Sequence, residues 1–285
     1  MATSVVIGPS SRGLGISVAN KLKADKIYVQ HKKFPDGESY IRLEKPVKGD
    51  VVVVQTLFPQ NESIVDFLLM LDVIREFKPK SITAVIPYFA YARQWERYLK
   101  WESISAKTIA SLIDAKVSKV LLVDIHNKIL LKFFKKASEL SAAKLIGEHF
   151  RKLENPFVLS PDQERGSFAK AIAGKLKCDY SWLSKHRDRY TGKTVSHMRH
   201  KIDLRGKNAI IADDIISSGG TVLNAIGILK KLGVKGIYVA VSHYIPRGAH
   251  KLLLKAGAKE VIATNSITSE VAKLDLSGII ADALA

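Results

Sequence analysis

One stretch of sequence decides what we expect of this chain: Ala209-Ile210-Ile211-Ala212-Asp213-Asp214-Ile215-Ile216-Ser217-Ser218-Gly219-Gly220-Thr221. Its apolar start, 209–212, has the length of a buried strand, and the apolar spacing from Val222 to Leu229 predicts a helix. Two acids and a polar, glycine-containing loop lie between them. Such a loop turns backbone N–H groups inward, and the helix start adds unpaired donors, so the stretch predicts a phosphate-binding loop. It lacks the lysine of a P-loop, and the two carboxylates suit sugar hydroxyls or a cation held over them.

This stretch resembles the ribose-5-phosphate (PRPP-binding) loop of type I phosphoribosyltransferases and of ribose-phosphate pyrophosphokinases. The alternative is a flavodoxin-like strand–helix turn that carries a chance pair of acids. The resemblance implies that Asp213 and Asp214 bind the ribose hydroxyls and that Asp213 also contacts a metal ion. It further implies that the 5-phosphate is bound by the loop residues Ser217, Ser218, Gly219, Gly220 and Thr221.

The length and composition limit the classes of protein to which this chain can belong. A length of 285 residues with 47% hydrophobic content suits one large or two medium domains. The single cysteine, Cys178, excludes an internal disulfide and favours a cytoplasmic location. No apolar run approaches the length of a membrane span, and residues 1–5 show no signal peptide. We therefore expect no membrane partner.

The net charge of +18 allows two interpretations. One is nucleic-acid binding through a basic face. The other is an enzyme with anionic substrates and a lysine-rich surface. Because the lysines are scattered along the chain, we favour the enzyme and expect no specific nucleic-acid partner.

Short apolar runs alternate with helical patterns throughout the chain, which predicts an α/β protein. We expect two similar three-layer α/β domains with mainly parallel central sheets, and the resemblance implies the type I phosphoribosyltransferase fold. The domains are residues 1–142 and 143–273, and the resemblance implies that a tail at about 274–285 packs back on the first. A Gly13-x-Gly15 turn after the first strand is too partial a match to indicate a dinucleotide site.

The sequence Phe34-Pro35-Asp36-Gly37-Glu38 is a turn that carries two carboxylates. Pro-Asp-Gly is a common hairpin turn, which is the alternative reading. The complete five-residue unit, however, resembles a motif of ribose-phosphate pyrophosphokinases. The resemblance implies that Phe34, Asp36 and Glu38 hold the adenosine of an ATP bound by a neighbouring subunit, so the protein is expected to be at least a homodimer.

Polar residues follow two further predicted strands, at the edge of the sheet where ligands bind. Arg93 and Gln94 come after the strand 82–86, and Asp124 and His126 end the strand 119–124. By resemblance, Arg93, Gln94 and His126 bind the ATP phosphates, and Asp124 and His126 contact magnesium. The family pattern is departed from at Trp95-Glu96-Arg97 and at Asn127, whose roles the sequence does not indicate.

The second domain carries two more motifs. Asp162 follows the strand 156–159, and by resemblance it is a metal ligand, although Gln163-Glu164-Arg165 replaces the usual glycine-rich continuation. Lys185 and Arg187 alternate, so in a strand they share one face. A solvated hairpin is the alternative. The resemblance implies that both cations, together with His126, act on the transferring phosphoryl groups.

The motifs run in the family's order from Phe34 to Ile267, with Asn265 where an aspartate is usual. The resemblance implies a ribose-phosphate pyrophosphokinase that uses Mg²⁺, ATP and ribose 5-phosphate to make PRPP and AMP. Three alternatives remain: a non-catalytic regulatory relative, a phosphoribosyltransferase that consumes PRPP, and a nucleic-acid-binding regulator on the same fold.

Overall fold

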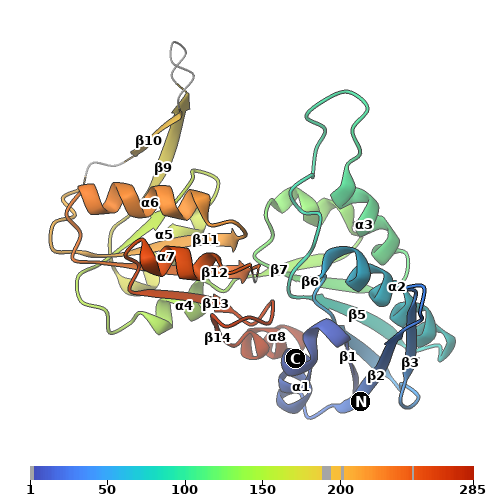
Figure 1. Cartoon of the computed structure of the whole chain (residues 1–285). Coiled ribbons are helices and arrows are strands. Elements are labelled where there is room, and N and C mark those ends of the chain that lie inside the picture. The colour runs from blue at the N-terminus through green and yellow to red at the C-terminus, as the bar shows by residue number, and fades with distance from the viewer. Residues whose placement is uncertain (1–2, 188–193, 200–201, 246) are drawn as a thin grey trace. The chain divides into compact units, whose positions relative to one another are not determined.

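The computed structural model describes residues 3–187, 194–199, 202–245 and 247–285 (Figure 1). The chain divides into two compact units. Unit 1 contains Met1–Ser141, Asn265–Thr268 and Asp275–Ala285, and unit 2 contains Ala142–Thr264 and Ser269–Leu274.

A seven-stranded sheet forms the middle layer of unit 1, with strand order β3-β2-β1-β4-β5-β6-β7. All neighbours in it are parallel except the β2–β3 hairpin at one edge. The strands are β1 (Thr3–Ile7), β2 (Asp25–Lys33), β3 (Ser39–Leu43), β4 (Asp50–Val54), β5 (Ser81–Ile86), β6 (Lys119–Val123) and β7 (Ala137–Leu140).

Helices cover both faces of this sheet (Figure 1). The helical segments of unit 1 are η1 (Pro9–Ser11), α1 (Arg12–Lys21), α2 (Gln60–Glu76), α3 (Ser105–Asp114), η2 (Lys128–Phe133) and α8 (Ser277–Leu284). Alternate strand residues such as Val53 and Ala84 pack with Phe67 of α2 and Ala110 of α3. The strand residues between them are buried on the opposite face, and α8 packs against α1. The strands therefore read as continuous apolar runs, as expected for a parallel sheet covered on both faces.

Unit 2 is built on the same plan, with strand order β10-β9-β8-β11-β12-β13-β14. Its neighbours are parallel except for the β9–β10 hairpin. The strands are β8 (Pro156–Ser160), β9 (Tyr180–Arg187), β10 (Thr194–Met198), β11 (Asn208–Ile216), β12 (Gly236–Tyr244), β13 (Glu260–Thr264) and β14 (Ala272–Leu274).

The helices of unit 2 are α4 (Ala143–His149), α5 (Gly166–Leu176), α6 (Gly220–Lys231) and α7 (Ala249–Lys255). Apolar residues of α6 and α7 pack on one set of strand residues, which includes Ile211 and Val239. Those of α4 and α5 pack on the alternate set, which includes Ile210 and Ala240. Unit 2 is thus a second three-layer body with its own two cores.

The structure confirms the predicted α/β class with two mainly parallel sheets. One strand is longer than predicted. The strand of the central stretch was expected to end at Ala212, but β11 continues through Asp213 and Asp214 to Ile216. Pairing with β12 carries the strand past the acids, because register partners exist as far as Ile216 and Tyr244. Within the described ranges, every helix is too short or too polar to cross a membrane.

Candidate functional site

Parallel sheets bind ligands beyond the carboxyl ends of their strands. The predicted site residues of unit 1 follow β5 and β6 or lie in the β2–β3 turn, and those of unit 2 follow β8, lie in β9, or end β11. Each unit therefore gathers its candidate residues along one edge of its own sheet, apart from the hairpin residues.

The two acids of the central stretch are buried at the end of β11. Asp213 is 6% exposed and Asp214 is 4% exposed. The backbone N–H of Asp214 donates to Oδ1 of Asp213 at 2.9 Å. Burial, and then the negative charges of Asp214 and Asp162, raise the pKa of Asp213 well above its ordinary value. The protein therefore concentrates carboxylates where they are costly to ionise, which is typical of a functional site.

The loop after β11 leads directly into the N-terminus of α6. Gly219 is the N-cap of this helix, with φ of +82°, a left-handed conformation that glycine adopts without strain. Within the described residues no side chain caps α6, and its first turn contains no acidic residue. The helix start thus offers backbone N–H groups and the positive end of its dipole, which suits an anion such as a phosphate.

The turn between β8 and α5 adds a cation to this edge. Oδ1 of Asp162 accepts the backbone N–H of Arg165 at 3.0 Å. The guanidinium of Arg165 forms an ion pair with the carboxylate of Asp214. The sequence marked Arg165 only as a departure from the family pattern, because a partner 49 positions away leaves no local signal.

Lys185 and Arg187 lie in β9, opposite Ser196 and Thr194 of β10 in the strand register. Their side chains lie outside the part of the chain that the structure describes. The predicted roles of both residues therefore remain predictions.

In unit 1, the chain turns sharply where β6 ends. Asp124 is buried and has φ of +37°, a region that non-glycine residues rarely adopt. Its backbone N–H donates to the carbonyl of Leu140, and that of Ile125 donates to Oε1 of Glu139 at 3.1 Å. These two contacts hold a strained turn at the predicted Asp124–His126 motif, and such strain is concentrated at functional sites.

The structure explains the departure at Asn127. Its side-chain oxygen accepts the backbone N–H of Ile129 at 3.0 Å, so Asn127 is the N-cap of η2. This is a role that asparagine fills well at helix starts. Asn127 therefore shapes the segment that follows His126.

The segment after β5 is organised by one carboxylate that the sequence reading missed. Oε2 of Glu102 accepts the backbone N–H groups of Tyr98 and Leu99 at 2.9 and 3.0 Å and lies 3.4 Å from Nε2 of Gln94. Nε of Arg97 donates to the carbonyl of Glu102 at 2.9 Å. Arg93, in contrast, is exposed. Glu102 thus ties Gln94 into a closed loop, beside which Arg93 is open to solvent.

The predicted adenosine motif is the exposed turn of the β2–β3 hairpin. The backbone N–H of Phe34 donates to the carbonyl of Glu38, and that of Glu38 donates to Oδ1 of Asp36. Gly37 has φ of +95°, which requires glycine. Phe34 is 50% exposed, and its ring meets that of Tyr40 edge-on with 6.1 Å between the ring centroids. An exposed ring on a rigid turn is available to stack on a flat ligand.

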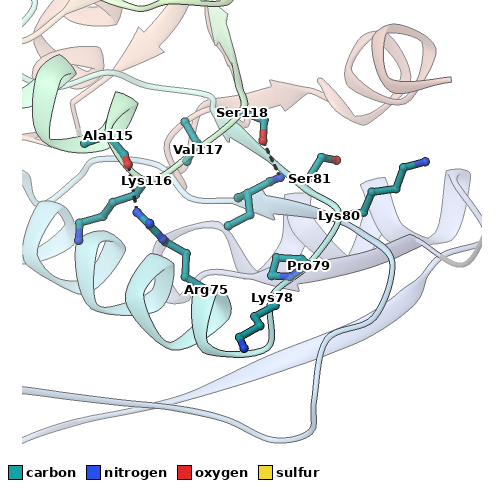
Figure 2. A pocket seen from close by; sticks show the side chains of 10 residues that line it. Arg75, Lys78, Pro79, Lys80, Ser81, Ala115, Lys116, Val117 and Ser118 are labelled. Atoms are coloured by element: carbon teal, nitrogen blue, oxygen red, sulfur yellow. Dashed lines mark hydrogen bonds between the residues drawn. The ribbon is translucent and has the colours of Figure 1, made fainter.

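A basic hollow of about 300 Å³ lies elsewhere in unit 1 (Figure 2). Arg75, Lys78, Lys80 and Lys116 contribute its charge, and Arg75 donates to the carbonyl of Ala115 at 3.0 Å. It lies where β5 and β6 begin, because its lining includes Ser81 and Ser118. The hollow is therefore at the opposite edge of the sheet from Asp124 and His126.

Two family models match the chain. The N-terminal domain of ribose phosphate pyrophosphokinase matches residues 3–116, and the phosphoribosyl transferase domain matches residues 133–275. The ribose-phosphate pyrophosphokinase of Methanothermobacter thermautotrophicus is 36% identical and covers 98% of this chain and 99% of its own. That of Pyrococcus furiosus is 38% identical over 95% of this chain and 97% of its own.

A solved structure is similar over the same length. Phosphoribosylpyrophosphate synthetase from Mycobacterium smegmatis is 28% identical, has a TM-score of 0.85, and covers 100% of this chain and 98% of its own. Both units and the connections between them thus have counterparts in one known protein.

Proposed function

The chain belongs to the ribose-phosphate pyrophosphokinase family, and from this premise we propose how its two units divide the reaction. The protein is a ribose-phosphate diphosphokinase, a transferase of nucleotide biosynthesis. The anomeric hydroxyl of ribose 5-phosphate attacks the β-phosphorus of ATP, the bond from that phosphorus to the α–β bridging oxygen breaks, and AMP leaves. The products are PRPP and AMP.

Unit 2 binds ribose 5-phosphate in this proposal. The observation that carries it is the path of the chain from two buried acids in β11, through the left-handed Gly219, into the start of α6. Asp213 and Asp214 accept the sugar hydroxyls. The 5-phosphate lies on the loop and binds the backbone N–H groups and hydroxyls of Ser217, Ser218, Gly219, Gly220 and Thr221.

Unit 1 binds the phosphates of ATP. Arg93 and Gln94, after β5, and His126, after β6, supply positive charge and hydrogen-bond donors at one edge of the sheet. Lys185 and Arg187, in β9, neutralise the pyrophosphoryl group while it moves between the substrates. Such a transfer depends mainly on positioning and on charge stabilisation in the transition state, and these cations supply both.

Magnesium is the proposed cofactor, and the donor set fits it. Asp162 and Asp213 are close enough for one charge to raise the pKa of the other, and carboxylate oxygens are preferred Mg²⁺ ligands. Among the described residues, no three His, Cys, Asp or Glu side chains form a metal cluster. Mg²⁺ usually takes one or two carboxylates and completes its shell with phosphates and water. We assign it to Asp124 and His126 in unit 1 and to Asp162 and Asp213 in unit 2; when bound, it neutralises phosphate charge.

The hairpin turn holds the adenosine. Phe34 stacks on the adenine, and Asp36 and Glu38 accept hydrogen bonds from the amine and ribose. In this proposal the turn serves the ATP site of a neighbouring copy, so the active form is at least a homodimer. A dilution series in analytical ultracentrifugation, followed by activity, tests this part, because a fully active monomer contradicts it.

We also propose a cytoplasmic location. Cys178 is the single cysteine, and burial followed by the nearby charge of Asp179 raises the pKa of its thiol to about 11. The thiol is therefore poorly suited to disulfide exchange at neutral pH, which fits a compartment where thiols stay reduced.

The activity is tested by AMP formation from ATP and Mg²⁺ by the purified protein, with and without ribose 5-phosphate. We expect AMP only when ribose 5-phosphate is present, in step with PRPP. AMP release without the sugar phosphate would indicate a hydrolase instead.

The alternatives predict other results. A non-catalytic relative binds ribose 5-phosphate but makes no AMP. A phosphoribosyltransferase consumes PRPP when a free base is added. A nucleic-acid-binding regulator gives a salt-dependent gel shift.

A further inference from the structure

The β2–β3 hairpin of unit 1 extends beyond the neighbouring strand of its sheet. The register of β2 with β1 ends at Tyr28, and the residues Val29–Lys33 pair with β3, the last strand at this edge. Residues 29–43, which carry the turn Phe34–Glu38 at their tip, therefore form a two-stranded ribbon. Such a ribbon is marginally stable in water unless it packs against another element.

Helix α2 supplies that element, because it packs against β3 (Figure 1). Leu43 of the ribbon belongs to the same apolar core as Phe67 of α2, and Val29 and Ile41 pack against this core. In the strand register, Val29 lies opposite Leu43 and His31 lies opposite Ile41. Alternate residues of a strand share a face with the residues directly opposite them. The face of the ribbon that carries Val29 and His31 therefore lies on α2.

Two polar contacts join this face to α2 near the tip of the ribbon. Nζ of Lys33 lies 2.7 Å from Oε1 of Glu62, and Nε2 of His31 lies 3.3 Å from Oδ2 of Asp66. The spacing along the strand matches the spacing along the helix, since each places its two side chains on one face. Lys33 directly precedes Phe34. The contacts therefore end one residue before the ring that is proposed to stack on adenine.

The two contacts differ in burial. The side chains of Lys33 and Glu62 are 42% and 55% exposed, and such an exposed pair contributes little. The side chain of Asp66 is 4% exposed and that of His31 is 28% exposed. Within the described residues, Oδ1 of Asp66 makes no hydrogen bond. Burying a partly bonded acid is costly, and an apolar residue at this position of α2 would avoid that cost. Asp66 therefore calls for a role other than stability.

We propose that Asp66 and His31 are positioning residues of the ATP site. Their contact holds the ribbon on α2 and so fixes the direction in which Phe34 is presented to adenine. This inference rests on the proposed function, because it concerns the turn that is proposed to hold adenosine. It adds two residues that lie outside every motif found in the sequence, and it gives the buried acid of α2 a part in nucleotide binding.

The test is steady-state AMP formation by the full chain with varied ATP and saturating ribose 5-phosphate. The Asp66→Ala change should raise the KM for ATP by about threefold to tenfold, the range for losing one polar contact. It should leave kcat and the KM for ribose 5-phosphate nearly unchanged. His31→Ala should have the same effect, and the H31A/D66A double variant should lose no more than either single variant, because the contact needs both partners. Asp66→Asn keeps the shape and one acceptor oxygen, so it should recover part of the loss.

Controls on the same helix separate positioning from folding. Ile74→Ala removes a buried apolar side chain from the last turn of α2, so it should lower the midpoint of thermal unfolding without changing the KM for ATP. Glu62→Gln, in the exposed pair, should raise that KM by less than about twofold. Hydrogen–deuterium exchange reads the position of the ribbon directly. In folded Asp66→Ala, peptides that cover residues 29–43 should exchange faster, whereas those that cover β4 should not change.

Phe34→Ala is the reference for adenine binding and should raise the KM for ATP at least as much as Asp66→Ala does. If Phe34→Ala raises this KM and folded Asp66→Ala does not, the inference is overturned while the proposed function stands. An equal rise in Ile74→Ala would also overturn it, because the effect would then follow from lost stability. If Phe34→Ala leaves the KM for ATP unchanged, or the wild type makes no AMP, the proposed function itself fails and the inference fails with it.

Discussion

The two units have the same strand order but carry different residues at the ends of matching strands. In each, the first three strands run outward to an antiparallel edge hairpin, and the remaining four follow on the other side of the first. The β2–β3 hairpin of unit 1 thus takes the same place as the β9–β10 hairpin of unit 2, and β4 takes the same place as β11. What differs is the chemistry at the ends of these matching strands.

The ends of β4 and β11 show the difference most clearly. After β4, unit 1 has Gln55 and Thr56, which are buried and neutral. Oε1 of Gln55 accepts the N–H of Ser10, and the hydroxyl of Thr56 donates to the carbonyl of Ser266. At the matching place in unit 2, Asp213 and Asp214 are buried carboxyl groups. A shared topology therefore supplies the same edge in both units, and the residues at the strand ends give it neutral polar groups in unit 1 and buried carboxyl groups in unit 2.

The largest effect on activity is expected from substitutions in the two edge hairpins. If Lys185 stabilises the transition state as proposed, the Lys185→Ala change in β9 should lower kcat by about a hundredfold to a thousandfold. The KM for ribose 5-phosphate should hardly change. In the matching hairpin, Lys32→Ala in β2 is the control and should leave kcat near the wild-type value. Steady-state assays of AMP formation check both, and an equal loss in kcat and in sugar affinity for Lys185→Ala would count against its catalytic role.

The next largest effect is expected from substitutions at the matching ends of β11 and β4. If Asp214 accepts the sugar hydroxyls as proposed, the Asp214→Ala change should raise the apparent KM for ribose 5-phosphate by about tenfold to a hundredfold. Gln55→Ala, at the matching end of β4, should lower stability without raising that KM. If both changes raised this KM alike, the proposed difference between the end of β11, which binds the sugar, and the end of β4, which does not, would be wrong.

Thermal stability should also differ between the two strand ends: a change at Gln55 should lower it, whereas a change at Asp213 should raise it. Because the pKa of Asp213 is raised in the fold, the folded protein holds a proton that the unfolded chain releases, so stability falls as pH rises through the raised pKa. The Asp213→Asn change should therefore raise the midpoint of thermal unfolding at neutral pH by roughly a few degrees while abolishing activity. The gain should shrink as pH falls and Asp213 takes up its proton.

This measurement is made in EDTA, because a bound cation would stabilise the carboxylate. Asp203→Asn is the control, since its exposed carboxyl has the opposite shift: hydrogen bonds from Arg205 lower its pKa to about 2. A lower midpoint for Asp213→Asn than for the wild type at neutral pH would contradict the prediction.

The smallest effect concerns another departure from the family pattern, Asn265 in unit 1. Nδ2 of Asn265 donates to Oδ1 of Asp275 at 2.8 Å, and its oxygen accepts the N–H of Leu276 at 2.9 Å. An aspartate cannot donate the first of these bonds. We expect Asn265→Asp to lower the free energy of unfolding by about 1 kcal/mol at neutral pH, and less in acid, as measured by urea titration. A loss of activity without a loss of stability would mean that Asn265 acts at the site.

The sequence alone predicted the strand or turn in which most candidate site residues lie. Phe34–Glu38, Asp124–His126 and the stretch from Asp213 to Thr221 each combine a local strand or turn signal with residue types of clear chemistry. It missed Glu102 and the Arg165–Asp214 pair, because side chains meet there through tertiary folding rather than through spacing. It also ended β11 too early, because aspartate is rare in strands, and here pairing with β12 overrides that preference.

The division of the chain into units has a consequence for its synthesis. The polypeptide crosses from one unit to the other four times, after Ser141, Thr264, Thr268 and Leu274. Helix α8 and the Asn265–Asp275 contact belong to unit 1 but are translated only after Ala142–Thr264. On the ribosome, unit 2 can therefore acquire most of its sheet while unit 1 still lacks the helix that covers α1. A fragment that stops at Ser141 would expose that apolar surface, and nascent chains of this length are where a chaperone would be expected to bind.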